Sequence, residues 1–197
     1  MKNQKLFLLL YPIKYNINYL NMNFMKNLFI LSALLLAFLA SYAQEDDRGY
    51  IVKVGEQAPD IDILYTDGTQ KKLSDFRGKT VMLQFTASWC GVCRKEMPFI
   101  EKDIQQKYKN NPDFVLIGID LKESKEKTIQ FAKDLKITYP LTLDPEGKSF
   151  YSYAAQGAGV TRNVIIDKNG KIVYLTRLYT PEEFNGMLQE IKKQVGQ

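Results

Sequence analysis

The pattern of apolar and polar positions along the chain predicts an alternation of strands and helices at its centre. Two apolar runs rich in β-branched and aromatic residues, 80–86 and 114–120, indicate buried strands. Each run is followed by a stretch in which apolar residues recur at helical spacing, at 92–108 and at 124–135. A strand–helix–strand–helix order is the signature of parallel strands joined by right-handed crossovers. The centre of the chain is therefore predicted to be an α/β unit.

Shorter elements are predicted on either side of this unit. Upstream we expect strands at 51–54, 61–65 and 70–73, a hairpin turn at Asp67-Gly68, and a loop or single helical turn at 74–78. Downstream we expect an extended piece after Pro140, a short helix around 147–154, a loop at 157–159, a hairpin of strands 163–166 and 171–176, and a last helix that begins with a capping box at Thr180 and ends near 194. Pro98 lies inside the first central helix, where its missing N–H predicts a bend.

The only two cysteines of the chain lie at the junction of the first central strand and helix. In the run Cys90-Gly91-Val92-Cys93, Cys90 lies where the predicted strand ends and the predicted helix begins. The first turn of a helix offers unpaired N–H groups and the positive end of the helix dipole, which favour a thiolate and lower the pKa of such cysteines. We therefore predict that Cys90 is the attacking nucleophile and that Cys93, on the same turn and less exposed, is the resolving thiol.

Three other interpretations of the pair are weaker. A structural disulfide that closes so short a loop constrains the unfolded chain only weakly. A closed zinc site usually needs four cysteine or histidine ligands, and the chain has no third cysteine and no histidine. A buried pair of small apolar side chains does not fit the flanking Ser88, Gly91 and charged Arg94-Lys95-Glu96. A redox-active dithiol is the favoured interpretation.

The N-terminus has the pattern of a secretory signal peptide. A basic Met25-Lys26-Asn27 is followed by an apolar run at 28–40 and by Ser41-Tyr42-Ala43, which resembles a cleavage site. The run is shorter than a membrane span requires, so an uncleaved transmembrane anchor is the less favoured alternative. We expect four regions: 1–24, a mis-assigned start or disordered; 25–43, the signal peptide; 44–49, a disordered leader; and 50–197, a single folded domain.

The charge balance gives no sign of a nucleic-acid partner. The chain carries 27 basic and 22 acidic residues, and the first 43 residues contain four lysines and no acid. Without that segment, 23 basic residues face 22 acidic ones, so the basic pI belongs mostly to the targeting sequence. Export to an oxidising compartment suits a cysteine pair that exchanges disulfides.

Four ordered motifs resemble those of the thioredoxin-like proteins of the TlpA/ResA type, and the resemblance runs from about Gly55 to about Lys193. The motifs are Gly55-Glu56-Gln57-Ala58-Pro59, Asp67-Gly68, the run from Leu73 to Lys79, and the run from Ala87 to Pro98. Together they form a strong signal, whereas C-x-x-C alone is a moderate one. The resemblance implies a thioredoxin-like α/β fold, with a central mixed β-sheet flanked by helices and an N-terminal β-hairpin extension.

The same resemblance implies an exported thiol–disulfide oxidoreductase of the bacterial periplasm or cell envelope. Its redox centre would be the Cys90–Cys93 disulfide, with no other cofactor and no metal. Its partners would be protein disulfides, which it most plausibly reduces, for instance those of apocytochromes c awaiting haem, and a membrane electron donor of the thiol-reductase type. We expect a monomer.

Two other functions are alternatives to this one. A peroxidase of the peroxiredoxin kind shares the fold, but its motif carries Thr or Ser three residues before the peroxidatic cysteine and proline four residues earlier still. This chain has Ala87 and Leu83 at those places, so the peroxide site is not matched. The second alternative is a non-enzymatic binding module of the cell envelope that retains the dithiol as a relic.

Several residues around the pair are candidates for supporting roles. Trp89 either shields the disulfide or anchors the core, and Gly91-Val92, between the cysteines, influences the reduction potential. Thr161 occupies the place where thioredoxin-like folds carry a cis-proline facing the dithiol, and we expect a trans Val160–Thr161 peptide. Its hydroxyl is then predicted to hydrogen-bond a thiolate, with Arg162 adding positive potential at the rim. The alternative is that Thr161 only shapes the backbone.

The proton acceptor for Cys93 is left open by the sequence. Thioredoxins carry a buried carboxylate six positions before the first cysteine, and this chain has Gln84 there. A buried amide must find hydrogen-bond partners, which is a sufficient role for Gln84. Water, Glu96 or Asp120 remain as acceptors.

Overall fold

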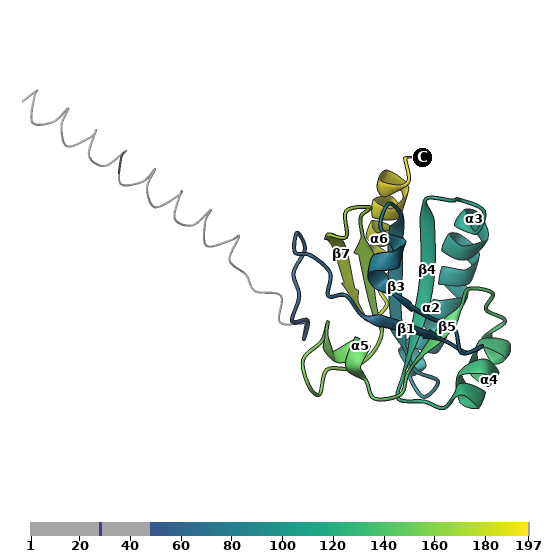
Figure 1. Cartoon of the computed structure of the whole chain (residues 1–197). Helices are drawn as coiled ribbons and strands as arrows, with labels where there is room; N and C mark the ends of the chain where they lie inside the picture. The colour runs from purple at the N-terminus through teal and green to yellow at the C-terminus, as the bar shows by residue number, and fades with distance from the viewer. Residues whose placement is uncertain (1–27, 29–47, 197) are drawn as a thin grey trace, which may run out of the picture. The chain divides into compact units, whose positions relative to one another are not determined.

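The computed structural model describes residues 48–196 together with Leu28 (Figure 1). The predicted signal peptide, apart from Leu28, and the predicted leader up to residue 47 lie outside the described residues. Within the described part of the chain, none of the helices combines the length and the apolar character needed to cross a membrane.

One seven-stranded mixed sheet forms the centre of the domain, in the order β2-β1-β5-β4-β3-β6-β7 (Figure 1). Its strands are β1 (Asp62–Tyr65), β2 (Gln70–Lys72), β3 (Thr80–Thr86), β4 (Phe114–Leu121), β5 (Leu141–Asp144), β6 (Arg162–Ile166) and β7 (Ile172–Arg177). Strands β3, β4 and β5 run parallel, β6 pairs antiparallel with β3, and β7 pairs antiparallel with β6. The hairpin β1–β2 extends the other edge by antiparallel pairing with β5. The predicted mixed sheet and N-terminal hairpin are therefore present.

The helical elements follow the predicted order. They are the 3₁₀ turn η1 (Leu73–Phe76), α2 (Gly91–Ile100), the π-helical turn η2 (Glu101–Gln105), α3 (Gln106–Tyr108), α4 (Lys125–Leu135), α5 (Lys148–Tyr151) and α6 (Pro181–Gln194). The predicted helix at 92–108 is thus a helical run of three parts. Pro98 cannot donate a backbone hydrogen bond, and the π-helical turn begins three residues after it, where the sequence predicts a bend.

Strand β3 is buried throughout, and its two faces meet different partners. Successive side chains of a strand point to opposite sides of the sheet. On one side, the ring of Phe85 lies 5.6 Å from that of Phe150 and 5.3 Å from that of Tyr153, centroid to centroid. On the other side, the Thr86 hydroxyl donates to the sulfur of Met97 in α2 at 3.2 Å. The strand that delivers the cysteines is therefore fixed by packing from both sides.

Helix α2 contacts both α4 and α6. The guanidinium of Arg94 lies 5.4 Å from the ring centroid of Phe131 in α4. At the other end of the helix, the ring of Phe99 lies 6.2 Å from that of Phe184 in α6. The helix that begins at the dithiol is thus held between two neighbours.

The predicted strand at 51–54 is wrong. Residues 48–57 instead form an irregular N-terminal strap, joined to the domain by isolated bridges from Tyr50 to Ala154 and from Gln57 to Lys171. Val52 is buried, but Ile51 and Val54 remain 57% and 59% exposed, so the segment does not present a buried strand face. Gly55 has φ of +95°, a left-handed conformation incompatible with a continuing strand.

Only half of the predicted capping box forms at the start of α6. The Thr180 hydroxyl accepts a hydrogen bond from the Glu183 N–H at 3.2 Å. The Glu183 carboxylate accepts from the backbone N–H of Arg177 at 2.8 Å, and it pairs with Arg48 at 2.6 Å. Glu183 therefore ties α6 to β7 and to the N-terminal strap instead of returning to Thr180.

Candidate active site

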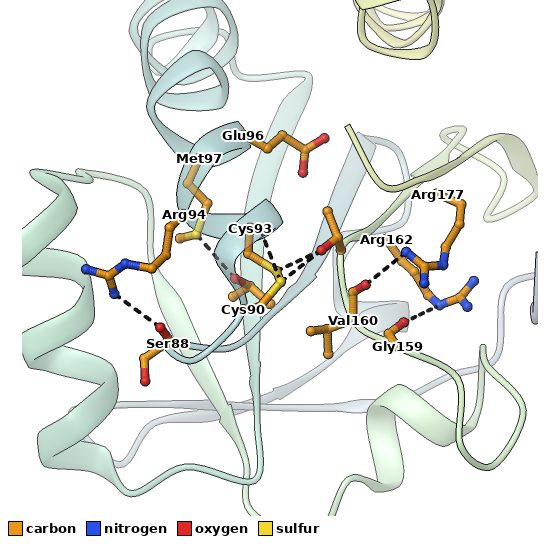
Figure 2. The surroundings of a disulfide bond; sticks show 12 residues. Ser88, Cys90, Cys93, Arg94, Glu96, Met97, Gly159, Val160, Arg162 and Arg177 are labelled. Atoms are coloured by element: carbon orange, nitrogen blue, oxygen red, sulfur yellow. Dashed lines mark hydrogen bonds between the residues drawn. A yellow bond between two sulfur atoms is a disulfide. The ribbon is translucent and has the colours of Figure 1, made fainter. Parts of the chain in front are cut away.

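Cys90 caps the N-terminus of α2, and Cys93 lies behind it on the first turn. The two form a disulfide, and the backbone N–H of Cys93 donates to the Cys90 sulfur at 3.1 Å (Figure 2). Cys90 is 9% exposed and Cys93 is completely buried. A turn at the end of β3 places them, with the Cys90 N–H donating to the Ala87 carbonyl at 3.1 Å. The predicted difference in exposure is confirmed: Cys90 is the more exposed of the two cysteines.

Thr161 lies against both sulfurs, as the sequence predicts. Its hydroxyl oxygen is 3.0 Å from the sulfur of Cys90 and 3.0 Å from that of Cys93. Its N–H donates to the Phe85 carbonyl of β3 at 3.1 Å, and its carbonyl accepts from the Leu178 N–H at 3.0 Å. The described residues contain no cis peptide bond, so the Val160–Thr161 peptide is trans. The neighbouring strands therefore hold this hydroxyl at the disulfide.

The backbone of Thr161 adopts an unusual conformation. Its φ is +71°, and for a β-branched residue such an angle is a genuine outlier that costs roughly 1–3 kcal/mol. Leu178, whose N–H donates to Thr161, also has positive φ, at +66°. Thr161, at the sulfurs, is thus hydrogen-bonded to a second non-glycine residue with positive φ, a clustering that is typical of functional sites.

Arg162 does not lie at the rim of the site, so that prediction is wrong. Its side chain is 1% exposed and points away from the sulfurs (Figure 2). It donates to the carbonyls of Gly159 at 3.0 Å and Arg48 at 2.7 Å, and it lies 4.4 Å from the ring centroid of Tyr50. Arg162 lies opposite Phe85 in the β3–β6 register, and paired residues on neighbouring strands point to the same face of the sheet, so Arg162 shares the face of Phe85. Arg162 instead anchors the N-terminal strap.

The residues near the cysteines differ widely in exposure. Trp89 is 63% exposed, so it is not the core anchor that was one of its two predicted roles. Gly91 is exposed and Val92 is partly buried, whereas Val160, on the facing loop, is buried. The Val160 carbonyl accepts a hydrogen bond from the Arg177 side chain of β7 at 3.4 Å, which holds the loop backbone at Val160.

Glu96 is a buried acid one helical turn beyond Cys93. It is 1% exposed, and its carboxylate accepts a hydrogen bond from the Asn163 amide at 2.9 Å. Burial raises the pKa of Glu96 to about 7, although the amides of Asn163 and Gln84 act to lower it. Between pH 4.5 and about 7 the native state therefore holds a proton that the unfolded chain releases. This group makes the free energy of unfolding fall as the pH rises through that window.

The two other polar groups singled out from the sequence lie in different surroundings. The Gln84 carbonyl oxygen accepts from the Tyr139 hydroxyl at 2.7 Å, so Gln84 is a buried amide with a partner, as predicted. Asp120 is also buried, and its carboxyl accepts from the Thr128 hydroxyl of α4 at 2.6 Å. Of the two acids considered as proton acceptors, Glu96 is the one on the helix of the dithiol.

A contact that the sequence did not indicate fixes the loop before Cys90. The Ser88 N–H and hydroxyl both donate to the Glu123 carboxylate, at 2.5 and 2.7 Å. Arg94 donates to the Ser88 carbonyl at 3.1 Å (Figure 2). The only sequence signals were a serine beside the C-x-x-C motif and an acid after the next strand, and neither identifies the other as its partner.

Comparisons with known proteins agree with this geometry. A profile of the Redoxin family matches residues 53–193. The thiol-disulfide oxidoreductase ResA of Geobacillus thermodenitrificans is 30% identical over 166 residues, which cover 84% of this chain and 91% of the relative.

Solved structures share the fold. A candidate protein disulfide isomerase from Bacteroides thetaiotaomicron, determined in solution, has a TM-score of 0.73 and 61% identity, covering 76% of this chain and 94% of that one. A candidate thiol:disulfide interchange protein DsbE from Chlorobium tepidum has a TM-score of 0.64 and 28% identity, covering 74% and 99%. The predicted thioredoxin-like fold is thereby confirmed. With its Cys90–Cys93 pair at the start of α2, the chain belongs to the Redoxin family as a ResA-type, thioredoxin-like thiol–disulfide oxidoreductase.

Proposed function

We propose that this oxidoreductase is exported to the cell envelope and reduces disulfides of other proteins there. The observation that carries the proposal is the asymmetry of the pair: Cys90 keeps 9% of its surface exposed at the helix N-terminus, and Cys93 is completely buried behind it. An accessible nucleophile backed by a buried resolving thiol suits exchange with a large partner, since one sulfur meets the substrate and the other completes the reaction internally.

The reaction consists of two exchanges. The Cys90 thiolate attacks one sulfur of the substrate disulfide, which forms a mixed disulfide and releases the other substrate sulfur as a thiolate. Cys93 then loses its proton and attacks the Cys90 sulfur, which releases the second substrate thiolate and forms the Cys90–Cys93 disulfide. The substrate gains two electrons and the protein loses two. A further turnover requires a dithiol donor, for which we propose a membrane thiol reductase.

The proposed location and substrates have separate support. The apolar run at 28–40, with its basic flank and small-residue end, supports export. The relative named ResA supports a thiol–disulfide exchange partner, and the family resemblance makes apocytochromes c awaiting haem the first substrates to test.

We further propose that Glu96 accepts the proton of Cys93. Glu96 is buried one turn along α2 from Cys93, and the Asn163 amide that holds it lies two residues from Thr161, which contacts both sulfurs. The pKa of Glu96, raised to about 7 by burial, suits a group that exchanges protons near neutral pH. Asp120 is directed to Thr128 on α4 and is the less suitable acceptor.

The first prediction separates a disulfide reductase from a peroxidase. The protein should catalyse the reduction of insulin disulfides by dithiothreitol, and Cys90→Ser should abolish this catalysis because it removes the nucleophile. Consumption of hydrogen peroxide should stay at the rate of the thiols in solution, since Ala87, where peroxidases carry a hydroxyl, is buried and apolar. Rapid peroxide consumption without insulin reduction would contradict the proposal.

The second prediction assigns the cysteine roles. Cys93→Ser, produced from the whole chain in the organism that encodes it, should accumulate mixed disulfides through Cys90 in the envelope fraction, because no resolving thiol remains. Cys90→Ser should trap little, since Cys93 is completely buried. Non-reducing electrophoresis followed by mass spectrometry identifies the trapped proteins. Equal trapping by both variants would reverse or erase the assignment, and trapping only in the cytosol would contradict export.

The third prediction concerns the hydroxyl of Thr161. Thr161→Val keeps the branched shape but removes the hydroxyl, whereas Thr161→Ser keeps the hydroxyl. Loss of a hydrogen bond to a charged group should raise the pKa of the Cys90 thiol and slow its alkylation at neutral pH roughly tenfold in the valine variant alone. The rate of iodoacetamide labelling against pH measures this. Equal rates in both variants and the wild type would leave Thr161 with a purely structural role.

The fourth prediction tests Glu96. Below about pH 7 the acid holds its own proton and cannot accept another, so release of the substrate from the mixed disulfide should accelerate as the pH rises through 7. Glu96→Gln should lose this rise and prolong the mixed disulfide roughly tenfold or more near pH 7.5. The two proteins should converge at alkaline pH, where Cys93 ionises without help. Stopped-flow decay of a fluorescent mixed disulfide gives the rate, and identical profiles would exclude Glu96 as the acceptor.

A further inference from the structure

A carboxylate outside the dithiol holds the loop that carries Cys90. Glu123 lies between β4 and α4, and it accepts both the N–H and the hydroxyl of Ser88, at 2.5 and 2.7 Å. The ammonium of Lys127 lies 2.5 Å from the same carboxylate. Ser88 is two residues before Cys90, so Glu123 fixes the backbone that delivers the nucleophile to the start of α2.

A second buried carboxyl lies within hydrogen-bonding reach of Glu123. Asp120 is completely buried, and its Oδ2 accepts from the Thr128 hydroxyl at 2.6 Å. Its Oδ1 is buried without a donor among the described residues. Two adjacent buried carboxylates repel each other strongly when both are charged. A proton held by Asp120 removes this repulsion and gives its carboxyl group an O–H that can donate to Glu123.

We propose that Asp120 and Glu123 are a proton-sharing pair that positions the Cys90 loop. With one proton between them, the pair carries a single negative charge and Glu123 holds Ser88 firmly. When the proton is lost, repulsion between the two carboxylates weakens the hold of Glu123 on Ser88, and the loop before Cys90 loosens. Asp120 and Glu123 are thus positioning residues, and their effect on catalysis rests on the proposed role of Cys90 as nucleophile.

The surroundings of Asp120 and Glu123 place the loss of the shared proton near neutral pH. Burial raises the pKa of Asp120 to about 7; Thr128 acts against this rise, and the charge of Glu123 adds to it. Although burial also acts to raise the pKa of Glu123, hydrogen bonds from Lys127 and Ser88 outweigh it and keep Glu123 ionised. The loop should therefore be held tightly below about pH 7 and released above it.

Two further charged groups lie on the neighbouring elements. Arg94 of α2 donates to the Ser88 carbonyl, so it holds the same loop from the other side. Asp144 of β5 lies next to Leu121 in the sheet register, but its carboxylate accepts from the backbone of Ser149 and Phe150 in α5. Lys127 is thus the cation that directly offsets the charge of the pair.

The experiment follows the amide of Ser88 by NMR from pH 5 to pH 9 in the disulfide form, in which neither cysteine titrates. The Ser88 N–H resonance should show a transition with its midpoint near pH 7, matched by the carboxyl carbon of Asp120. Asp120→Asn, which keeps a hydrogen-bond donor toward Glu123 at every pH, should lose that transition. A Ser88 resonance that is constant over this range, or that still titrates near pH 7 in Asp120→Asn, would overturn the shared proton.

The link to Cys90 is tested on the reduced protein. Glu123→Gln weakens the hold on Ser88 and should slow alkylation of Cys90 at pH 6.5 roughly tenfold, because loss of positioning is costly for a nucleophile. The matched control is Glu101→Gln, because Glu101 accepts the N–H and hydroxyl of Thr138 at 2.8 and 2.7 Å in the same manner as Glu123 accepts those of Ser88. The Glu101→Gln variant should alkylate at the wild-type rate. Equal rates in all three proteins would overturn the positioning role. The Ser88 titration does not depend on thiol chemistry, so its failure is distinguishable from failure of the insulin assay.

Discussion

The structure depends on the placement of one sulfur at the N-terminus of one helix. A thiolate at Cys90 needs hydrogen-bond donors in a largely buried position, and the first turn of α2 supplies the Cys93 N–H. This geometry requires that β3 end where α2 begins, with a short turn between them. It also requires that the strand cannot shift, which packing on both of its faces ensures.

The domain buries two acids, Glu96 and Asp120, and protonation limits the free-energy cost of burying them. Burial raises the pKa of each to about 7, so at mildly acidic pH neither needs to carry an isolated buried charge. Each acid also reduces the stability of the domain as the pH rises toward 7, because the unfolded chain releases its proton earlier. A domain selected only for stability would place apolar residues there, so their presence points to function.

The parts of the fold governed by periodicity could be predicted from the sequence, and those governed by contacts across the sheet could not. Strand β3 was predicted with its observed bounds and α6 to within a residue at its end, because long apolar runs and a capping threonine with proline are local signals. The position of Thr161 at the sulfurs followed from family resemblance. The direction of the Arg162 side chain could not be predicted in the same way, since the face on which a side chain lies changes with every residue of a strand. The Ser88–Glu123 contact joins residues 35 apart and exists only because β3 and β4 pair side by side.

The two faces of β3 separate stability from chemistry. Phe85 packs against aromatic residues on one face, and that face of the strand carries no ionisable partner of the dithiol among the groups described above. The other face turns toward α2, where Gln84 lies near Glu96 and Thr86 contacts Met97. Polar and titrating groups can therefore vary on the α2 face without disturbing the aromatic packing that holds the strand. Gln84 illustrates this freedom: it stands where thioredoxins carry a buried acid, while in this chain the buried acid, Glu96, belongs to the facing helix. Under the proposal made for Glu96, the proton acceptor lies on the helix instead of the strand, while the Cys90 sulfur stays at the start of α2.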